Sequence, residues 1–115
     1  MRNFKPSEFD CPDCGSNLMD TVFLDKIDFA REVAGVPFNI NSGFRCEAHN
    51  RAVGGSSTSS HPLGLACDIA ARDSRSRFKI IDGLIRAGIK RIGIAKTFIH
   101  ADDDPDKGPE VAWLY

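Results

Sequence analysis

The sequence lacks the features that mark exported and membrane-spanning proteins. Its amino-terminal residues contain no apolar stretch of the kind found in signal peptides, and no segment is long and apolar enough to span a bilayer. Internal repeats and low-complexity tracts are absent as well. We therefore expect synthesis in a cytoplasm without a signal peptide, and retention there unless a partner exports the protein or lysis releases it.

An excess of charge of one sign is also missing. Fifteen Lys and Arg residues stand against sixteen Asp and Glu residues, which leaves a formal net charge of -1. Without a basic field or a basic amphipathic segment, neither nucleic acid nor a membrane surface is an expected partner. A ligand must be held by local groups, and we expect the protein to be a monomer.

Cysteine is scarce, because four cysteines are too few for a disulfide scaffold. Two of them form the pair Cys11-x-x-Cys14, and a third begins Cys46-x-x-His49. Together they have the spacing of a structural Cys3His zinc site, which would fasten a loose amino-terminal loop beside Arg45. A disulfide and free thiols are the alternatives. A redox dithiol is disfavoured, since the pair does not open a helix after a strand.

A chain of 115 residues is long enough for one small domain, which we expect over residues 1–115. Its apolar spacing predicts two long helices. Asp20 caps the first, which runs to about Ala34, and Ser74 caps the second, which Gly88 ends. The positions expected to face the core are Phe23, Ile27, Ala30 and Ala34 in the first helix and Phe78, Ile81, Leu84 and Ile85 in the second.

The remaining pattern predicts a sheet. Strands are expected at 38–41, 65–71, 91–95, 98–102 and 111–115, with a short helix at 47–53 and a loop at 54–60. Helices packed against one side of a small, mostly antiparallel sheet follow, which is an α+β fold.

Strand alternation directs polar side chains to one face of two of these strands. Asp68 shares its face with Ala66 and Ala70, and these small residues leave room for a bulky group to approach the carboxylate. In a second strand His100 and Asp102 share a face. Core residues occupy the opposite faces, so the polar faces are free to converge.

Two imidazoles and one carboxylate, from His61, Asp68 and His100, match the ligands of a hydrolytic zinc ion with its fourth position open to water. A structural zinc ion would take four ligands, usually thiolates. Any one of the three residues alone would be interpreted as a surface, capping or turn residue. Their combination is what indicates a metal.

Three motifs run through the chain. They are Phe4-x-x-x-Glu8-Phe9-x-Cys11; Ser42-Gly43-Phe44-Arg45-x-x-x-His49-Asn50-x-x-Val53-Gly54-Gly55; and Ser59-x-His61-x-x-Gly64-x-Ala66-x-Asp68 with a later Phe98-Ile99-His100-x-Asp102. Together they resemble the M15 zinc peptidases, the D-alanyl-D-alanine carboxypeptidase and dipeptidase family, and above all its small phage-type branch. The likeness extends over nearly the whole chain.

The resemblance implies zinc on His61, Asp68 and His100, a Hedgehog-like α+β fold, and stem or cross-bridge peptides of peptidoglycan as substrates. It implies action on a cell wall, after release or export, in a phage, prophage or bacterial wall-remodelling system. The chain departs from the family in two places. Many relatives carry an acidic general base where this chain has Thr97, and many have Ala in place of Cys67.

Roles for the remaining polar residues follow from the resemblance. Arg45 is expected to neutralise an oxyanion or to hold a substrate carboxylate, with a surface ion pair as the alternative. Ser59 is expected to bind substrate or to form only a turn. Because the usual acid is missing, Asp102, which shares a strand face with His100, is the first choice for the base. The alternatives are that it orients a ligand imidazole or only caps the end of the strand. Asp104 and Glu110 come next.

The missing acid also supports a second function. A catalytically silent binding or structural domain that keeps zinc for stability is the alternative to a peptidase.

Gly64 is expected to let the chain bend between the first two ligands. Trp113 is expected either to wall the cleft or to join the core.

Overall fold

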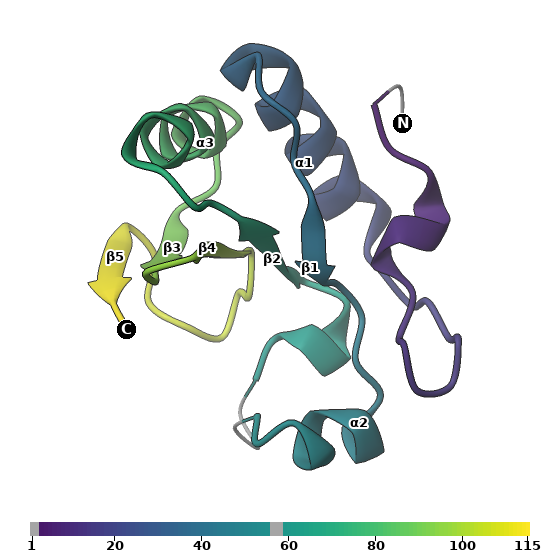
Figure 1. Cartoon of the computed structure of the whole chain (residues 1–115). Coiled ribbons are helices and arrows are strands. Elements are labelled where there is room, and N and C mark those ends of the chain that lie inside the picture. The colour runs from purple at the N-terminus through teal and green to yellow at the C-terminus, as the bar shows by residue number, and fades with distance from the viewer. Residues whose placement is uncertain (1–2, 56–58) are drawn as a thin grey trace.

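The computed structural model describes residues 3–55 and 59–115, and its described strands form one mixed sheet (Figure 1). The sheet order is β1-β2-β4-β3-β5, in which β3 and β5 are parallel and the other neighbouring pairs are antiparallel. The strands are β1 (Ile40–Ser42), β2 (Ala66–Ala70), β3 (Arg91–Ile94), β4 (Phe98–Asp102) and β5 (Val111–Leu114). The predicted mostly antiparallel sheet is therefore confirmed, although β1 begins later than expected and includes Ser42.

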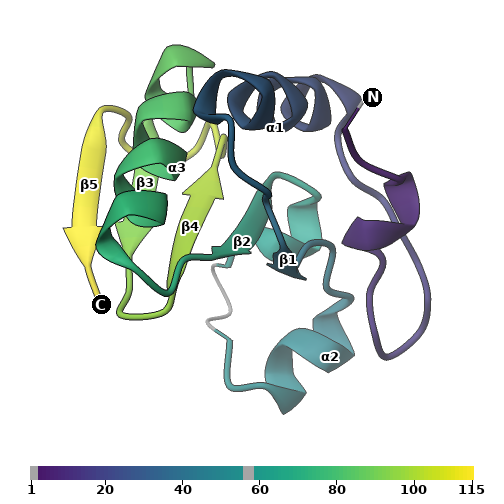
Figure 2. The same cartoon turned by 45° about the horizontal axis from the view of Figure 1, so that its top comes forward.

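Two long helices cover one face of this sheet, and the short helix lies at its other side (Figures 1 and 2). The long helices are α1 (Thr21–Ala34) and α3 (Ser74–Arg86), and the short one is α2 (Glu47–Ala52). Two 3-10 turns, η1 (Pro6–Phe9) and η2 (His61–Leu63), complete the described elements. This arrangement confirms the α+β class. None of the described helices has the length and hydropathy of a membrane span.

Both long helices begin at an aspartate whose side chain accepts a hydrogen bond from the first turn. Asp20 accepts from the backbone N of Phe23, as predicted, and its helix ends at Gly35, whose φ is 69°. In α3 the N-cap is Asp73, which accepts from the backbone N of Ser76. The prediction that Ser74 caps this helix was wrong by one residue, because the carboxylate of Asp73 takes the free N–H group.

The core-facing side of α3 also differs from the prediction. Leu84 is buried as expected, but Phe78 is 72% exposed and Ile85 is 60% exposed. Ile80 and Gly83 are buried instead. A Cβ atom on Gly83 would lie only 2.4 Å from the carbonyl oxygen of Ala30 in α1. The close approach of the two helices at this glycine decides which side of α3 faces inward, and apolar spacing alone does not reveal it.

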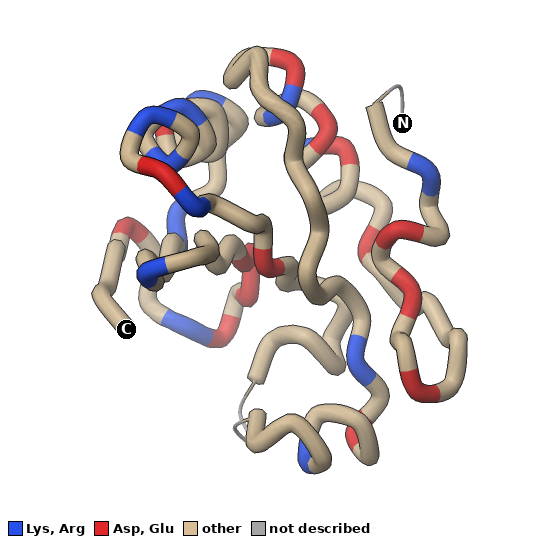
Figure 3. Tube along the Cα trace, in the orientation of Figure 1, with Lys and Arg blue, Asp and Glu red and all other residues tan. Residues whose placement is uncertain are grey.

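The two faces of the central strands carry different chemistry, as alternation predicted. Cys67 and Ile69 of β2 and Ile99 and Ala101 of β4 belong to the hydrophobic core beneath α1 and α3. The opposite face therefore presents the polar residues of both strands. The loop after β4 is mainly acidic, with Lys107 as its one basic residue among Asp103, Asp104, Asp106 and Glu110 (Figure 3).

Candidate functional site

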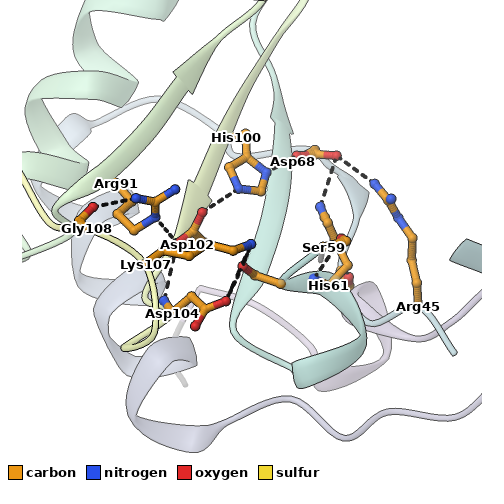
Figure 4. Close-up of polar contacts among 12 residues, drawn as sticks. Arg45, Ser59, His61, Asp68, Arg91, His100, Asp102, Asp104, Lys107 and Gly108 are labelled. Carbon is orange, nitrogen blue, oxygen red and sulfur yellow. Dashed lines mark hydrogen bonds and ion pairs between the residues drawn. The ribbon is translucent and has the colours of Figure 1, made fainter. Parts of the chain in front are cut away.

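Asp68 and His100 lie directly opposite each other on the antiparallel strands β2 and β4. His61 begins η2, which leads into β2, and completes a group whose ligand atoms all lie within 4.8 Å of one another (Figure 4). All three side chains are buried. We call His61, Asp68 and His100 the His–Asp cluster. The structure thus brings together the three residues that the sequence predicted as metal ligands.

The ring of His61 is oriented by a backbone carbonyl. Its Nδ1 lies 2.8 Å from the carbonyl oxygen of Gly43. A carbonyl oxygen only accepts hydrogen bonds, so Nδ1 carries the proton and donates it. Nε2 then faces Asp68, 3.4 Å from its Oδ2. Gly64, which ends η2 with φ 72°, provides the bend expected between the first two ligands.

The ring of His100 lies between two carboxylates. Its Nε2 donates to Oδ2 of Asp102 at 2.8 Å, and its Nδ1 lies 2.9 Å from Oδ1 of Asp68. Burial acts most strongly on the pKa of His100 and lowers it, but hydrogen bonds to Asp102 and Asp68 outweigh burial and raise the pKa above its ordinary value. Because Asp102 engages Nε2, Nδ1 is the ring nitrogen of His100 that faces the other two members of the His–Asp cluster.

Asp68 is held in its ionised form. Burial is the largest influence on its pKa and raises it, but hydrogen bonds and charge from His100 and His61 outweigh burial and leave the pKa below its usual range. Arg45 adds a contact of 3.2 Å between its Nη2 and Oδ2 of Asp68. An ionised carboxylate is the form that binds a metal.

The geometry of the His–Asp cluster fits a zinc ion. Zinc bonds to nitrogen and oxygen of roughly 2.0–2.1 Å in a tetrahedral site place neighbouring donors about 3.4 Å apart. The separations here are 3.4 Å between His61 and Asp68 and 2.9 Å between Asp68 and His100, so small side-chain shifts suffice. Two imidazoles and one carboxylate also leave a fourth position free.

The His–Asp cluster opens into a cleft of about 360 Å³. Trp113 and Tyr115, from the end of the chain, form part of its wall, and the ring of Trp113 lies 5.6 Å from that of His100. Of the two roles expected for Trp113, the structure thus favours the wall. Among the residues that the structure describes, the lining comprises Arg45, Gly54, Gly55, Ser59, Ser60, His61, Asp68, Arg91, Phe98, His100, Asp102, Lys107, Trp113 and Tyr115.

Arg45 is fixed at the edge of the His–Asp cluster. Its Nε donates to Oγ of Ser42 at 2.9 Å, and its Nη1 donates to Oδ1 of Asn50 at 3.1 Å. Its third nitrogen, Nη2, contacts Asp68. The guanidinium is thus largely buried against the cluster, and its contact with Asp68 is not a surface ion pair. Asn50 belongs to one of the motifs quoted from the sequence, but no role was assigned to it there.

Asp102 is 1% exposed, and both of its carboxylate oxygens are engaged. Oδ2 accepts from His100, while Oδ1 accepts from Nε of Arg91 at 2.9 Å and from the backbone N of Asp104 at 3.2 Å. Burial is the largest influence on the pKa of Asp102 and raises it. The contacts together outweigh burial and leave the pKa below its ordinary value. Asp103 does not line the cleft and pairs with Lys26 at 2.7 Å.

A second polar group borders the cleft, and of its members the sequence analysis named only Asp104. Oγ of Ser60 donates to Oδ2 of Asp104 at 2.8 Å, and Nζ of Lys107 lies 2.8 Å from the same hydroxyl. No sequence pattern linked Ser60 with Asp104 and Lys107, because β2, α3, β3 and β4 lie between them in the chain.

Two other residues named in the sequence lie differently with respect to the cleft. Ser59 lines the cleft, and its Oγ accepts from the backbone N of His61 at 3.2 Å. Glu110 is exposed and is not among the lining residues.

The cysteines form a separate group. The sulfur atoms of Cys11, Cys14 and Cys46, here called the cysteine cluster, lie within 4.8 Å of one another, and all are free thiols. The imidazole of His49 is not part of this group; the backbone N of His49 donates to Sγ of Cys46 instead. The structure therefore assembles three of the four ligands predicted for a structural zinc. Cys67 lies in the core, where burial raises its thiol pKa.

Comparison with known families agrees with this geometry. The sequence model of a family described as Peptidase M15 matches residues 2–102. No curated protein matches the chain. The matched range contains the whole His–Asp cluster together with Arg45 and Asp102, so the family likeness and the structure converge on the same site.

Proposed function

Since the chain belongs to the M15 family of peptidases, we propose that it is a zinc-dependent peptidase acting on the peptides of bacterial peptidoglycan. The observation that carries this proposal is the buried His–Asp cluster at the base of an open cleft. D-Ala-D-Ala carboxypeptidase and endopeptidase activities are the two forms proposed, with the wall reached after release or export, as in a phage or prophage system.

A zinc ion on His61, Asp68 and His100 would supply a Lewis acid that activates water and polarises the scissile carbonyl. Neighbouring groups of the chain orient the ligand side chains toward the position that the zinc ion would occupy. The carbonyl of Gly43 holds His61 with Nε2 inward, and Asp102 holds His100 with Nδ1 inward. Such outer contacts set the tautomer and direction of ligand imidazoles.

Arg45 is proposed to bind a substrate carboxylate or a developing oxyanion. Ser42 and Asn50 anchor two of its nitrogens, so the guanidinium is positioned beside Asp68 before substrate arrives. A planar guanidinium offers two parallel donors to a carboxylate. Stem peptides of peptidoglycan carry such carboxylates, and Arg91 and Lys107 add two further cations to the lining. Ser59 is proposed as a hydrogen-bonding group at the same wall.

For Asp102 the contacts favour a positioning role over that of a general base. Its Oδ2 accepts from the Nε2 of His100, the nitrogen that points away from the cluster, and its Oδ1 accepts from Arg91 and Asp104. No oxygen of this carboxylate is left without a donor. We therefore assign Asp102 to the orientation of His100.

One observation favours a second candidate function, a catalytically silent domain that keeps zinc for stability. Thr97, which occupies the position of the family's acid, is exposed and does not line the cleft. The two carboxylates that do line it, Asp68 and Asp102, both have partners. Such a domain would bind wall peptides without cleaving them.

Incubation of the zinc-loaded protein with purified peptidoglycan and with synthetic stem peptides separates the two functions. Mass spectrometry of the products, with and without a chelator, should show peptide-bond cleavage that requires metal. His61→Ala serves as the matched negative control. Intact peptides after incubation with a zinc-loaded, correctly folded protein would refute the peptidase, and retained binding of those peptides would establish the silent domain.

A further inference from the structure

The cysteine cluster joins two segments that are distant in sequence. Cys11 and Cys14 lie in the loop after η1, and Cys46 is the N-cap of α2. The sulfur atoms of Cys11 and Cys46 are 3.7 Å apart. Two thiolates bound to one tetrahedral zinc ion, with bonds of about 2.3 Å, lie about 3.8 Å apart. The sulfurs are thus spaced as ligands of one metal, and too far apart for a disulfide.

The backbone around the cysteine cluster favours thiolates. The backbone N–H of His49 donates to the sulfur of Cys46 at 3.5 Å. Backbone donors stabilise negative charge on sulfur, and thiolate is the form that binds metal. Soft thiolate ligands without a redox partner suit zinc.

From this geometry we propose that Cys11, Cys14 and Cys46 bind a second zinc ion, with the fourth position open to solvent. Cys14 is exposed, whereas Cys11 is buried, so the open side of the group is the side of Cys14. The imidazole of His49 lies outside the group and is not a ligand. This assignment replaces the Cys3His site that sequence spacing alone indicated.

A metal at this position would fasten the segment that supports the His–Asp cluster. Phe9 precedes the first cysteines, and its carbonyl oxygen accepts from the backbone N of Phe44 at 2.8 Å. A Cβ atom on Gly43 would lie 2.7 Å from Cα of Phe9, so only glycine permits this contact. Gly43 in turn holds His61, and Arg45 directly precedes Cys46. Residues 43–46 are therefore held between the two clusters.

The test is the metal content of the purified full chain and of three variants. The wild type should contain two equivalents of zinc, and Cys14→Ser should contain one. Cys14 is the variant of choice because it is exposed, so the substitution leaves the core untouched. Cys67→Ala, a core cysteine outside the cluster, should keep both equivalents. His49→Ala should also keep both, and loss of zinc from it would overturn the three-thiolate assignment.

Cobalt(II) substitution supplies a readout that does not depend on activity. Thiolate-to-cobalt charge-transfer absorption should be present in the wild type and in His61→Ala, and lost in Cys14→Ser. Hydrogen exchange in residues 4–15 should become faster in Cys14→Ser, because the loop loses its fastening. A wild type with a single zinc and no charge-transfer band, or with a disulfide between Cys11 and Cys46 found by mass spectrometry, would overturn the proposal. Neither result bears on peptidase activity, which His61→Ala tests separately.

Discussion

The two ligand clusters of this molecule differ in what holds their donor atoms in place. In the His–Asp cluster two of the three residues lie opposite each other on paired strands, and all three side chains are buried. Each of the three also contacts a protein group outside the cluster. Strand pairing and hydrogen bonds thus hold the donor atoms of this site in place.

The cysteine cluster has less support from the fold. Two of its members lie in a loop, one of them exposed, and the backbone N–H of His49 donates to the sulfur of the third. Loops open more readily than paired strands. The His–Asp cluster should therefore keep its geometry when metal is removed, whereas the cysteine cluster should loosen.

The largest expected effect is that of His100→Ala. Turnover of stem peptides should fall by several orders of magnitude, because the His–Asp cluster loses one of its three ligands. One equivalent of zinc should be lost, while the cobalt–thiolate absorption of the cysteine cluster remains. Metal analysis and the peptide-cleavage assay check this expectation. Full zinc occupancy in His100→Ala would show that His100 is not a zinc ligand.

Asp102→Asn should cut turnover by roughly a hundredfold, the usual scale for losing the partner of a ligand imidazole. Zinc should still be present at saturating metal, but its affinity should fall, since an amide no longer fixes His100. A general base would instead alter the pH profile and leave zinc affinity unchanged. Asp103→Asn is the matched control, because Asp103 pairs with Lys26 away from the cleft. Near-normal turnover and zinc affinity in Asp102→Asn would exclude both roles.

Arg45→Lys should lower turnover by roughly tenfold or more and leave zinc content and folding unchanged. Lysine keeps the charge but cannot offer the planar pair of donors, and it loses the contacts to Ser42 and Asn50. Steady-state kinetics on a stem peptide measure the effect. Arg86→Lys, an exposed arginine on α3 paired with Asp82, is the control. If Arg45→Lys turns over the peptide like the parent, Arg45 has only a structural role.

Cys46→Ser should act mainly on stability. Serine keeps the N-cap acceptor of α2, so the helix cap is preserved while a metal ligand is removed. The free energy of unfolding in the presence of zinc should fall by about 2–3 kcal/mol, the linkage expected when a ligand at about a hundredfold its Kd is lost. Cys11→Ser should behave alike. Urea denaturation with and without chelator measures the change, and chelator should destabilise these variants less than the parent.

The smallest expected effect is the pH dependence of the metal-free protein. The pKa of His100 is raised in the fold, so its contribution to stability is complete below the unfolded value of about 6.5 and is lost as pH rises through the folded pKa. The pKa of Cys11 is lowered to about 6, because backbone N–H groups outweigh the larger single influence of burial. Its contribution is present above the unfolded value of about 8.5 and is lost as pH falls toward 6.

The two clusters should therefore give opposite slopes of stability against pH above neutrality. In chelator-treated protein, His100→Ala should make stability rise more steeply from about pH 6.5 to 8.5 than it does in the parent. Cys11→Ser should make it rise less. Urea midpoints over a pH series measure both slopes. Equal slopes in the parent and in His100→Ala would show that the contacts of His100 with Asp68 and Asp102 do not persist without metal.

The ligands of the His–Asp cluster were predictable because the information is local. Alternation along two short strands separates Asp68 and His100 from core residues, and the motif around His61 adds the third ligand. The helix α1 was predictable for the same reason, since Asp20, Gly35 and the apolar stripe between them are all encoded within one segment. Local backbone geometry decides such features before the chain packs.

Other features depend on which segments meet. The sequence named Asp102 but not its engagement by Arg91, and it named His49 but not the position of its ring outside the cysteine cluster. Ser60 and Lys107 became neighbours only when the loop after β4 turned toward η2.

From the sequence alone, the long helices, the strands, the polar face of each central strand and the predicted metal ligands could be named, because side-chain periodicity and capping act over a few residues. Only the tertiary structure decided the inward side of α3, the hydrogen-bond partners of Arg45 and Asp102, and the membership of the cysteine cluster. These depend on close approach between distant segments, as at Gly83 and Ala30, and on competition among several donors for one acceptor. Such contacts arise from packing, and no pattern along the chain records them.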